Sequence, residues 1–322
     1  MRRKLAVLVL LALALASAGA QAYPDRPVRL VVGFAAGGGA DLGARLFAAA
    51  LGERWHQQIV VENRGGVGGL LAAELVAHAP PDGYTLLACS INQVLAPLLY
   101  KNLAIDPVKD FASITATATL ANVLVVNPKS RFHSVGDLIA DAKARPGQLT
   151  YGSSGVGASL HLTMELFKSM AGVDIIHVPY KGGAPALADV IAGHIDMMFG
   201  NATEQVGAVK SGQVRALGVS ASHRLPALPD VPTIAESGVP GFEVVTWYGL
   251  CAPRAVPEPI LAQISEDAIA AINAPDYRRR LAEQGIEPSP MTRAEYAAFI
   301  DAQTAKWAKV VHAIGLEPGT VQ

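Results

Sequence analysis

Three glycine-rich loops carry the residue types and spacing that could bind a small anion. The first loop follows the apolar run Leu30–Val32, contains Gly37, Gly38 and Gly39, and leads into a helical segment that Asp41 can cap. A strand–loop–helix junction of this kind directs free backbone N–H groups, and the positive end of a helix dipole, at one point. Because such a point binds anions, the first loop is predicted to be an anion cradle.

The second and third loops have a similar design, since each delivers small residues to the start of a helix. Residues 151–157 supply the hydroxyls of Ser153 and Ser154, and residues 177–185 supply Lys181. A loop lysine is either a cation for the ligand or a solvated surface charge, and we favour the surface charge. Within the third loop, Tyr180 can stack on a ligand or form a hydrogen bond with it.

Catalytic and dinucleotide-binding interpretations of these loops fail on spacing. Gly37 and Gly39 are followed by Leu42, where the dinucleotide fingerprint has a third glycine. Val156 stands where the nucleophile pattern Gly-x-Ser-x-Gly ends in glycine. The sequence shows no pair of carboxylates, no Cys/His metal spacing and no activated nucleophile. The loops therefore indicate recognition rather than reaction, and we expect no enzyme activity, no cofactor and no metal.

Other polar and aromatic residues near these loops have two interpretations each. His161 is a candidate base or ligand contact, but a packed or cap-adjacent histidine is favoured. Asn201 follows an apolar run and offers an amide that can donate to a carboxylate. Trp247 could form a wall of a cleft or pack at a hinge.

The elements that position the loops alternate short apolar runs with helical segments, which is typical of a parallel α/β architecture. Ser134 with Asp137, and Thr292 with Glu295, have the spacing of capping boxes and predict two helix starts. Two β-prone runs, residues 111–126 and 242–252, are longer than a typical strand and could cross between two domains. Open α/β sheets bind ligands at the carboxyl ends of their strands, where the small-residue loops lie. We therefore predict two lobes with a cleft between them: residues 23–123 and 246–322 form one lobe, and residues 124–245 form the other.

The N-terminus and the charge restrict the class of protein further. Basic residues 2–4, an apolar run over 5–16 and a small-x-small site at 20–22 predict that residues 1–22 are a secretory signal peptide. A transmembrane anchor is disfavoured because the run is shorter than about 20 residues. Without the leader, 23 basic residues face 27 acidic residues, which leaves no basic field for nucleic acid.

The two cysteines, Cys89 and Cys251, each lie in an apolar strand-like run. A disulfide is possible in an exported protein. Two buried thiols that act as small hydrophobic residues are the favoured alternative.

Segments along nearly the whole mature chain, in order, carry a family resemblance. These segments are residues 23–32 with 34–41, 61–69, 81–86, 151–157 with His161 and Leu162, 177–182, 228–238 and 247–250. Each segment is weak by itself, and the ordered set is specific. With them the chain resembles the Bug family of periplasmic solute-binding proteins, which are the receptors of tripartite tricarboxylate transporters.

The resemblance implies a two-lobed periplasmic-binding-protein (Venus flytrap) α/β fold with two crossover strands, a periplasmic location and no catalysis. In such proteins the ligand carboxylate is held mainly by backbone groups and water from the first loop, here residues 34–41. Loops of the second lobe, here residues 153–157 and 180–182, close on the other end. Ala40 follows Gly39 in a loop where members often carry Ser, Thr or Pro, so a hydroxyl contact is lost here.

The expected function is therefore an extracytoplasmic receptor that delivers a small organic acid to membrane transporter subunits. The alternative is a ligand-sensing protein that feeds a periplasmic sensor kinase. The receptor is expected to be a monomer. The expected ligand-binding residues are Phe34, Ala36, Gly37, Gly38, Gly39, Ala40, Asp41, Ser90, Asn92, Ser153, Ser154, Gly155, Gly157, His161, Tyr180, Lys181, Gly182, Asn201 and Trp247.

Overall fold

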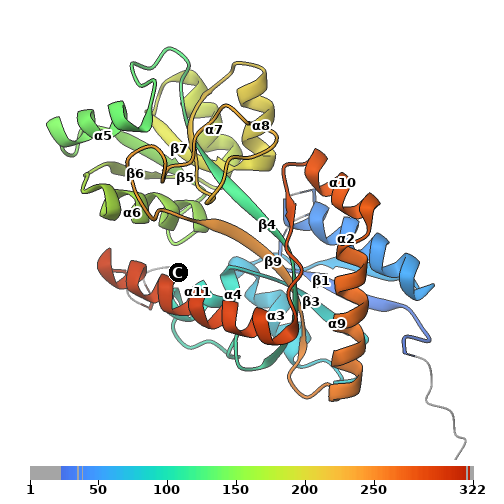
Figure 1. Ribbon diagram of the computed structural model, residues 1–322. Coiled ribbons are helices and arrows are strands. Elements are labelled where there is room, and N and C mark those ends of the chain that lie inside the picture. The colour runs from blue at the N-terminus through green and yellow to red at the C-terminus, as the bar shows by residue number, and fades with distance from the viewer. Residues whose placement is uncertain (1–22, 35, 38, 317, 320–322) are drawn as a thin grey trace, which may run out of the picture.

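The computed structural model describes residues 23–34, 36, 37, 39–316, 318 and 319. The expected signal peptide and the expected ligand residue Gly38 therefore lie outside the described residues. The chain folds into two α/β lobes that two strands connect (Figure 1). No helix in the described ranges is both long enough and apolar enough to cross a membrane.

The first lobe is built on a mixed sheet in which parallel and antiparallel pairs meet. Its strands, in spatial order, are β2 (Ile59–Asn63), β1 (Val28–Val32), β3 (Thr85–Ser90), β9 (Val245–Pro253) and β4 (Phe111–Val126), with β10 (Glu287–Pro288) on β4. β1 is parallel to β2 and to β3, whereas β9 is antiparallel to β3 and to β4. The carboxyl ends of β1 and β3 therefore meet at one edge of the sheet.

Helices cover both faces of this sheet. They are α2 (Gly39–Trp55), α3 (Leu70–Ala77) after the 3-10 turn η1 (Val67–Gly69), α4 (Asn92–Leu99), α9 (Glu258–Ile272), α10 (Pro275–Glu283) and α11 (Arg293–Ala313). Helix α2 packs with α9 and α10 over one apolar cluster, and α11 packs with α4 over the other. Apolar side chains on both faces of the strands explain why β1 and β3 are nearly all buried.

The second lobe repeats this plan on a smaller scale. Its strands, in spatial order, are β8 (Arg215–Val219), β4, β7 (Met197–Asn201), β5 (Thr150–Ser153) and β6 (Ile176–Pro179). Its helices are α5 (Val135–Ala144), α6 (Ser159–Ala171), α7 (Gly183–Ala192) and α8 (Ala202–Lys210).

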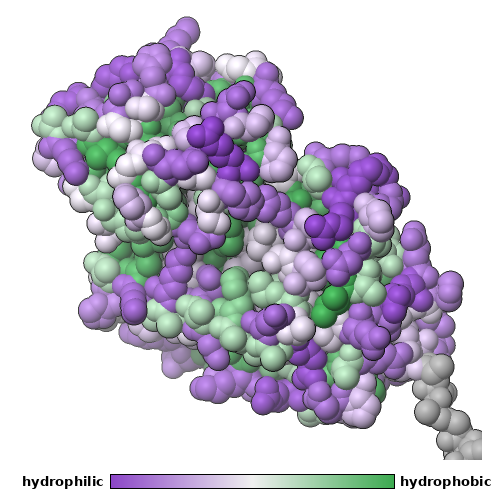
Figure 2. All heavy atoms as spheres, in the orientation of Figure 1, coloured by the Kyte–Doolittle hydropathy of each residue, from purple (hydrophilic) through white to green (hydrophobic). Residues whose placement is uncertain are grey.

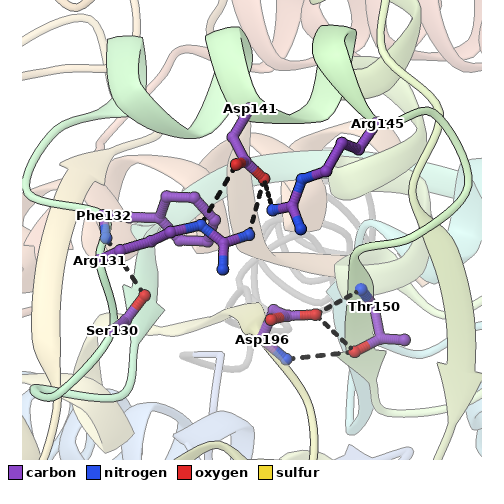
Figure 3. A network of polar contacts seen from close by, with 7 residues as sticks. All are labelled: Ser130, Arg131, Phe132, Asp141, Arg145, Thr150 and Asp196. Carbon is purple, nitrogen blue, oxygen red and sulfur yellow. Dashed lines mark hydrogen bonds and ion pairs between the residues drawn. The ribbon is translucent and has the colours of Figure 1, made fainter.

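Polar contacts fasten the outer end of the second lobe. Asp141 of α5 accepts hydrogen bonds from both Arg131 and Arg145, and Asp196 accepts from the backbone and the hydroxyl of Thr150 (Figure 3). The contacts of Asp196 with Thr150 join the start of β5 to the loop before β7, at the end of the lobe that lies away from the carboxyl ends of these strands.

Two strands cross between the lobes, as the long β-prone runs predicted. Residues 111–121 of β4 pair with β9, and residues 122–126 of the same strand pair with β7 and β8. Val244, directly before β9, donates its N–H to Ser220 of the second lobe. Figure 2 shows the two bodies with a notch between them on the right of the view. The boundaries at residues 123 and 246 stay predictions.

Several local predictions are confirmed. Ser134 with Asp137 and Thr292 with Glu295 form the two capping boxes that the sequence indicated, at α5 and α11. Helix α8 was missed, because its apolar face is weakly patterned, although Asn201 and Glu204 have the spacing of a capping box. This omission matters because α8 begins beside the cleft.

The favoured interpretation of the cysteines as free thiols is wrong, because Cys89 and Cys251 form a disulfide. Strand β9 returns beside β3, with Leu87 opposite Cys251 and Cys89 opposite Gly249. The two Cα atoms thereby lie 6.1 Å apart, within the range that a bridge requires. This neighbourhood depends on the long-range return of β9, which the local sequence around each cysteine does not reveal.

Candidate ligand-binding cleft

Asp41 organises the first loop and is itself fully engaged. Its Oδ2 accepts hydrogen bonds from the Gly37 N–H at 2.9 Å and from Arg45 Nε at 3.0 Å. Its Oδ1 accepts from Asn63 Nδ2 at 2.9 Å, and the same amide donates to the Phe34 carbonyl. Only 4% of Asp41 is exposed. Helix α2 begins at Gly39, so Asp41 lies within its first turn and not at the N-cap that was expected. Its carboxylate holds the loop in place through these contacts and does not face a ligand.

The hydrogen-bond partners of Asp41 keep its carboxylate ionised. Burial alone would raise the pKa of Asp41, but hydrogen bonds from Arg45, Gly37 and Asn63 outweigh burial and hold the pKa below its ordinary value. The carboxylate is therefore ionised at neutral pH. It neutralises Arg45 and aligns one backbone N–H of the loop.

The tip of the first loop faces the second lobe. Ala36 and Gly37 are exposed, and Gly39, the first residue of α2, is half-buried with Ala40. An ideal Cβ on Gly39 would lie 3.6 Å from Thr203 Oγ1 of α8 and 3.8 Å from the Tyr248 hydroxyl. The N-terminus of α2 thus lies across a narrow gap from groups of α8 and β9, where a side chain would fill the space.

The end of β3 meets the second-lobe loop along the same cleft. Asn92 donates from Nδ2 to the Gly68 carbonyl at 2.8 Å, and Ser90 Oγ accepts from the Asn92 N–H. A cavity of about 120 Å³ is lined by both lobes, through Gly68, Asn92, Leu95, Ala96, Leu99, Tyr100, Val156, Gly157 and Ala158. The structure therefore brings the expected residues Asn92 and Gly157 to one cavity whose other walls are largely apolar.

Ser153 and His161 of the second loop make hydrogen bonds inside the lobe. Ser153 is fully buried, and its Oγ contacts His177 Nε2 at 2.6 Å and the Gly155 backbone at 3.1 Å. His161 Nδ1 accepts from the Gly157 N–H at 3.0 Å. The packed, cap-adjacent interpretation of His161 agrees with this geometry. Ser154 and Gly155 remain partly exposed on the loop.

Two stacked imidazole rings, those of His161 and His177, contact residues of this loop. The rings of His161 and His177 lie 4.2 Å apart, and Tyr151 stacks on His177 at 4.8 Å. Burial lowers the pKa of His161, and burial together with the His161 ring lowers the pKa of His177 to about 4. Both rings are neutral at pH 7, as the acceptor role of His161 Nδ1 requires.

The third loop leads into α7, and its polar side chains have different surroundings. Tyr180 donates its hydroxyl to Asp189 Oδ2 at 2.6 Å. Lys181 is exposed, and Gly182 is the N-cap of α7 with φ of 128°, a conformation that favours glycine. Asn201, at the end of β7, is half-buried, and its Oδ1 has no hydrogen-bond partner.

Trp247 belongs to the core rather than to the cleft. It is fully buried, and its ring packs edge-on against Tyr296 at 5.9 Å and Phe299 at 5.6 Å. Since side chains alternate along a strand, the next residue, Tyr248, points to the other side. Its hydroxyl reaches the gap beside Gly39, where burial first and the charge of Glu204 second raise the Tyr248 pKa to about 12.

Sequence reasoning missed three residues of the cleft, Thr203, Glu204 and Tyr248. The alternation within the predicted crossing strand would have placed Tyr248 opposite Trp247. Thr203 and Glu204 lie on the missed helix α8, whose start could have been found from the capping-box spacing of Asn201 and Glu204. Across the described residues no group of three His, Cys, Asp or Glu side chains could hold a metal ion.

The sequence matches the family described as "Tripartite tricarboxylate transporter family receptor" over residues 44–316. The chain belongs to this family. Among relatives of this receptor, a UPF0065 protein of Pseudomonas sp. (strain P51), in the tcbD-tcbE intergenic region, is 39% identical, with 96% of this chain and 94% of that protein covered. Protein BugT of Bordetella pertussis is 33% identical, with 93% of each chain covered.

Solved structures agree with the fold of the receptor. The R. palustris protein Rpa4515, solved with adipate, matches with a TM-score of 0.82 and 38% identity over 92% of this chain and 99% of that one. MatC of Rhodopseudomonas palustris, solved with bound malate, matches with a TM-score of 0.76 and 33% identity over 90% of this chain and all of that one. The predicted two-lobed periplasmic-binding-protein fold and Bug-type membership are confirmed, and the family is one of solute receptors.

Proposed function

We propose that this receptor binds a small organic carboxylate in the cleft between its lobes, in the periplasm, and delivers it to the membrane subunits of a tripartite tricarboxylate-type transporter. Residues 1–22 are proposed to be a signal peptide removed on export. The observation that carries the proposal is the position of the loop between β1 and α2. Gly39, where this loop enters α2, lies across a narrow gap from the second lobe, since an ideal Cβ on it would be 3.6 Å from Thr203 Oγ1 and 3.8 Å from the Tyr248 hydroxyl.

The chemistry of the cleft supports a carboxylate. Free N–H groups at the start of α2 and the hydroxyls of Thr203 and Tyr248 are donors that suit an anion. A charge-assisted hydrogen bond contributes about 1.5–3 kcal/mol, so three or four of them reach the roughly 8 kcal/mol of micromolar binding. The two R. palustris relatives were solved with adipate and with malate. Residues 34–41, 153–157 and 180–182 are the proposed contact loops, and no metal or cofactor takes part.

The first test is the ligand itself, followed by a variant that blocks the loop. Native mass spectrometry of the purified protein should detect a co-purified acid, and calorimetry should give its affinity. Gly39→Val should abolish binding, because the added side chain enters the gap toward Thr203 and Tyr248. Gly43→Val is the control, since it adds the same side chain one turn along α2, where no atom lies within 4 Å of the new Cβ.

Delivery to a transporter needs a separate test. The ligand-loaded protein should be retained by detergent-solubilised membrane subunits of a tripartite transporter. Retention by a periplasmic sensor-kinase domain instead would favour the sensing alternative. Wild-type binding by Gly39→Val would contradict the cradle, and the absence of any carboxylate ligand would contradict the receptor function.

A further inference from the structure

One carboxylate of the second lobe faces the proposed carboxylate cradle. Glu204 lies in the first turn of α8, directly after Thr203, whose hydroxyl would touch a side chain on Gly39. The charge of Glu204 is felt at the Tyr248 hydroxyl, which also borders Gly39. An ideal Cβ on Gly183 would lie 2.7 Å from Glu204 Oε2, so the carboxylate also lies against the start of α7. Glu204 thus lies where the ends of α7, α8 and β9 converge on the cleft.

Within the part of the chain that the structure describes, this carboxylate has no cationic partner. Burial raises the pKa of Glu204, and only a hydrogen bond from the Asn201 side chain acts in the other direction. No Lys, Arg or His of the described residues is among the causes of that shift or forms an ion pair with Glu204. The side chain is nevertheless exposed to solvent, so a ligand can reach it.

A second acceptor lies beside it. The Asn201 side chain is hydrogen-bonded to Glu204, and the Asn201 Oδ1 atom is buried without a partner. Buried polar atoms usually have partners, so an unpaired acceptor beside a carboxylate that has no cation indicates a missing donor. The gap therefore combines donors at the start of α2, Thr203 and Tyr248 with two acceptors, the Glu204 carboxylate and Asn201 Oδ1.

We infer that the ligand is a carboxylic acid that carries an ammonium group at its other end, with the carboxylate on the α2 loop and the ammonium on Glu204 and Asn201. This inference rests on the proposed function and specifies the ligand class for the same cleft. A second carboxylate at the α8 end would meet Glu204 as a like charge, which is unfavourable in a partly desolvated cleft. An ammonium supplies three donors to this end.

Matched ligand pairs test the inference by calorimetry on the full mature protein. Each pair has the same chain length: 4-aminobutanoate against succinate, 5-aminopentanoate against glutarate, and 6-aminohexanoate against adipate. At the best length, the amino acid should bind at least about tenfold more tightly than the diacid, the ratio expected from one charge-assisted hydrogen bond. Glu204→Gln should reduce that ratio to near one while the melting temperature stays close to that of the wild type.

Two further variants test whether the charge at position 204 sets the preference for the amino acid over the diacid. Glu204→Lys should reverse the preference, so that the diacid binds more tightly than the amino acid. Glu266→Gln is the matched control, because Glu266 is an exposed glutamate on α9, and it should leave both affinities unchanged.

The inference and the receptor function fail in different ways. Failure of every amino acid of the panel to bind, or tighter binding of the diacid to the wild type, overturns the inference. An unchanged ratio in Glu204→Gln also overturns it. In each of these cases, binding of a diacid or of a co-purified acid leaves the carboxylate receptor intact, whereas the absence of any carboxylate ligand removes the receptor function as well.

Discussion

At the residue scale, the cleft depends on side chains that hold backbone groups in place and do not face a ligand. Asp41 binds the N–H of Gly37 in the first loop, and His161 binds the N–H of Gly157 in the second. Both acceptors are nearly buried. The backbone of each loop is therefore fixed before a ligand arrives, which limits the entropy lost on binding.

Asp41→Asn should destabilise the protein, because the new amide group presents donors to partners that are themselves donors. Gly37, Arg45 and Asn63 all donate to the present carboxylate. Leaving buried donors unpaired costs about 1–3 kcal/mol, so the free energy of unfolding in urea should fall by that amount. Glu53→Gln, on the exposed side of the same helix, is the control and should change little. An equally stable Asp41→Asn would show that the carboxylate is dispensable.

The buried histidines should make stability depend on pH. The pKa of His177 falls to about 4 through burial first and the neighbouring His161 second, whereas an unfolded histidine titrates near 6.5. Between these two pH values His177 is protonated in the unfolded chain but stays neutral in the folded protein. Stability is therefore lost as the pH falls from 6.5 toward 4.

His177→Phe keeps a stacked ring and cannot titrate. The difference in unfolding free energy between pH 7 and pH 4.5 should therefore be smaller than in the wild type by about 1–2 kcal/mol, after allowance for partial exposure. His312→Phe changes an exposed histidine of α11 and should retain the wild-type dependence. Parallel pH profiles for wild type and His177→Phe would exclude this role.

At the scale of elements, the return of β9 shapes the first lobe. Strand β9 lies between β3 and β4, and its Cys251 forms the disulfide with Cys89 of β3. Its Tyr248 side chain points toward the cleft, whereas Trp247 is buried in the core. One strand thus contributes to the covalent structure, to the packing and to the ligand site.

Removal of the disulfide should lower stability without changing the fold. The bridge joins residues 162 positions apart, so it restricts the unfolded chain, and a loss of about 2–4 kcal/mol is expected for Cys89→Ala with Cys251→Ala. Urea unfolding measures the loss, and circular dichroism checks the fold. Thiol titration of the unreduced protein in denaturant should detect no free thiol; two free thiols would contradict the bridge.

At the scale of the whole molecule, α11 links the lobes beside the two crossing strands. It begins under β4 of the first lobe, packs against α4, and also contacts α6 of the second lobe (Figure 1). A hinge motion therefore has to slide α6 over α11 as β4 and β9 bend. Such sliding between packed helices is a recognised mode of domain closure.

We expect a ligand to compact the molecule, because each lobe supplies part of the proposed contacts. Small-angle X-ray scattering at saturating ligand should show a smaller radius of gyration than the free protein. Gly39→Val, which should not bind, provides the control with the same ligand. An unchanged radius with a ligand proven to bind would mean that the cleft is already closed without it.

The local sequence was sufficient for most elements, α8 excepted, and for the order of the loops. The capping pairs Ser134–Asp137 and Thr292–Glu295 placed two helix starts correctly, because a cap depends on residues three positions apart. The long apolar run over 111–126 indicated a strand that serves two sheets, because no single small sheet needs sixteen residues. The ordered segments of the family then implied the two-lobed fold.

Tertiary structure alone decided which side chains are available in the cleft. The pairing of Cys89 with Cys251, the burial of Trp247 and the convergence of Gly39, Thr203 and Tyr248 all depend on strands and helices that are distant in the sequence. Sequence periodicity reports whether a face is buried, but not which distant element buries it. The sequence by itself therefore determined a two-lobed receptor with glycine loops at its strand ends, and only the packing of the lobes placed Glu204 near the proposed anion cradle.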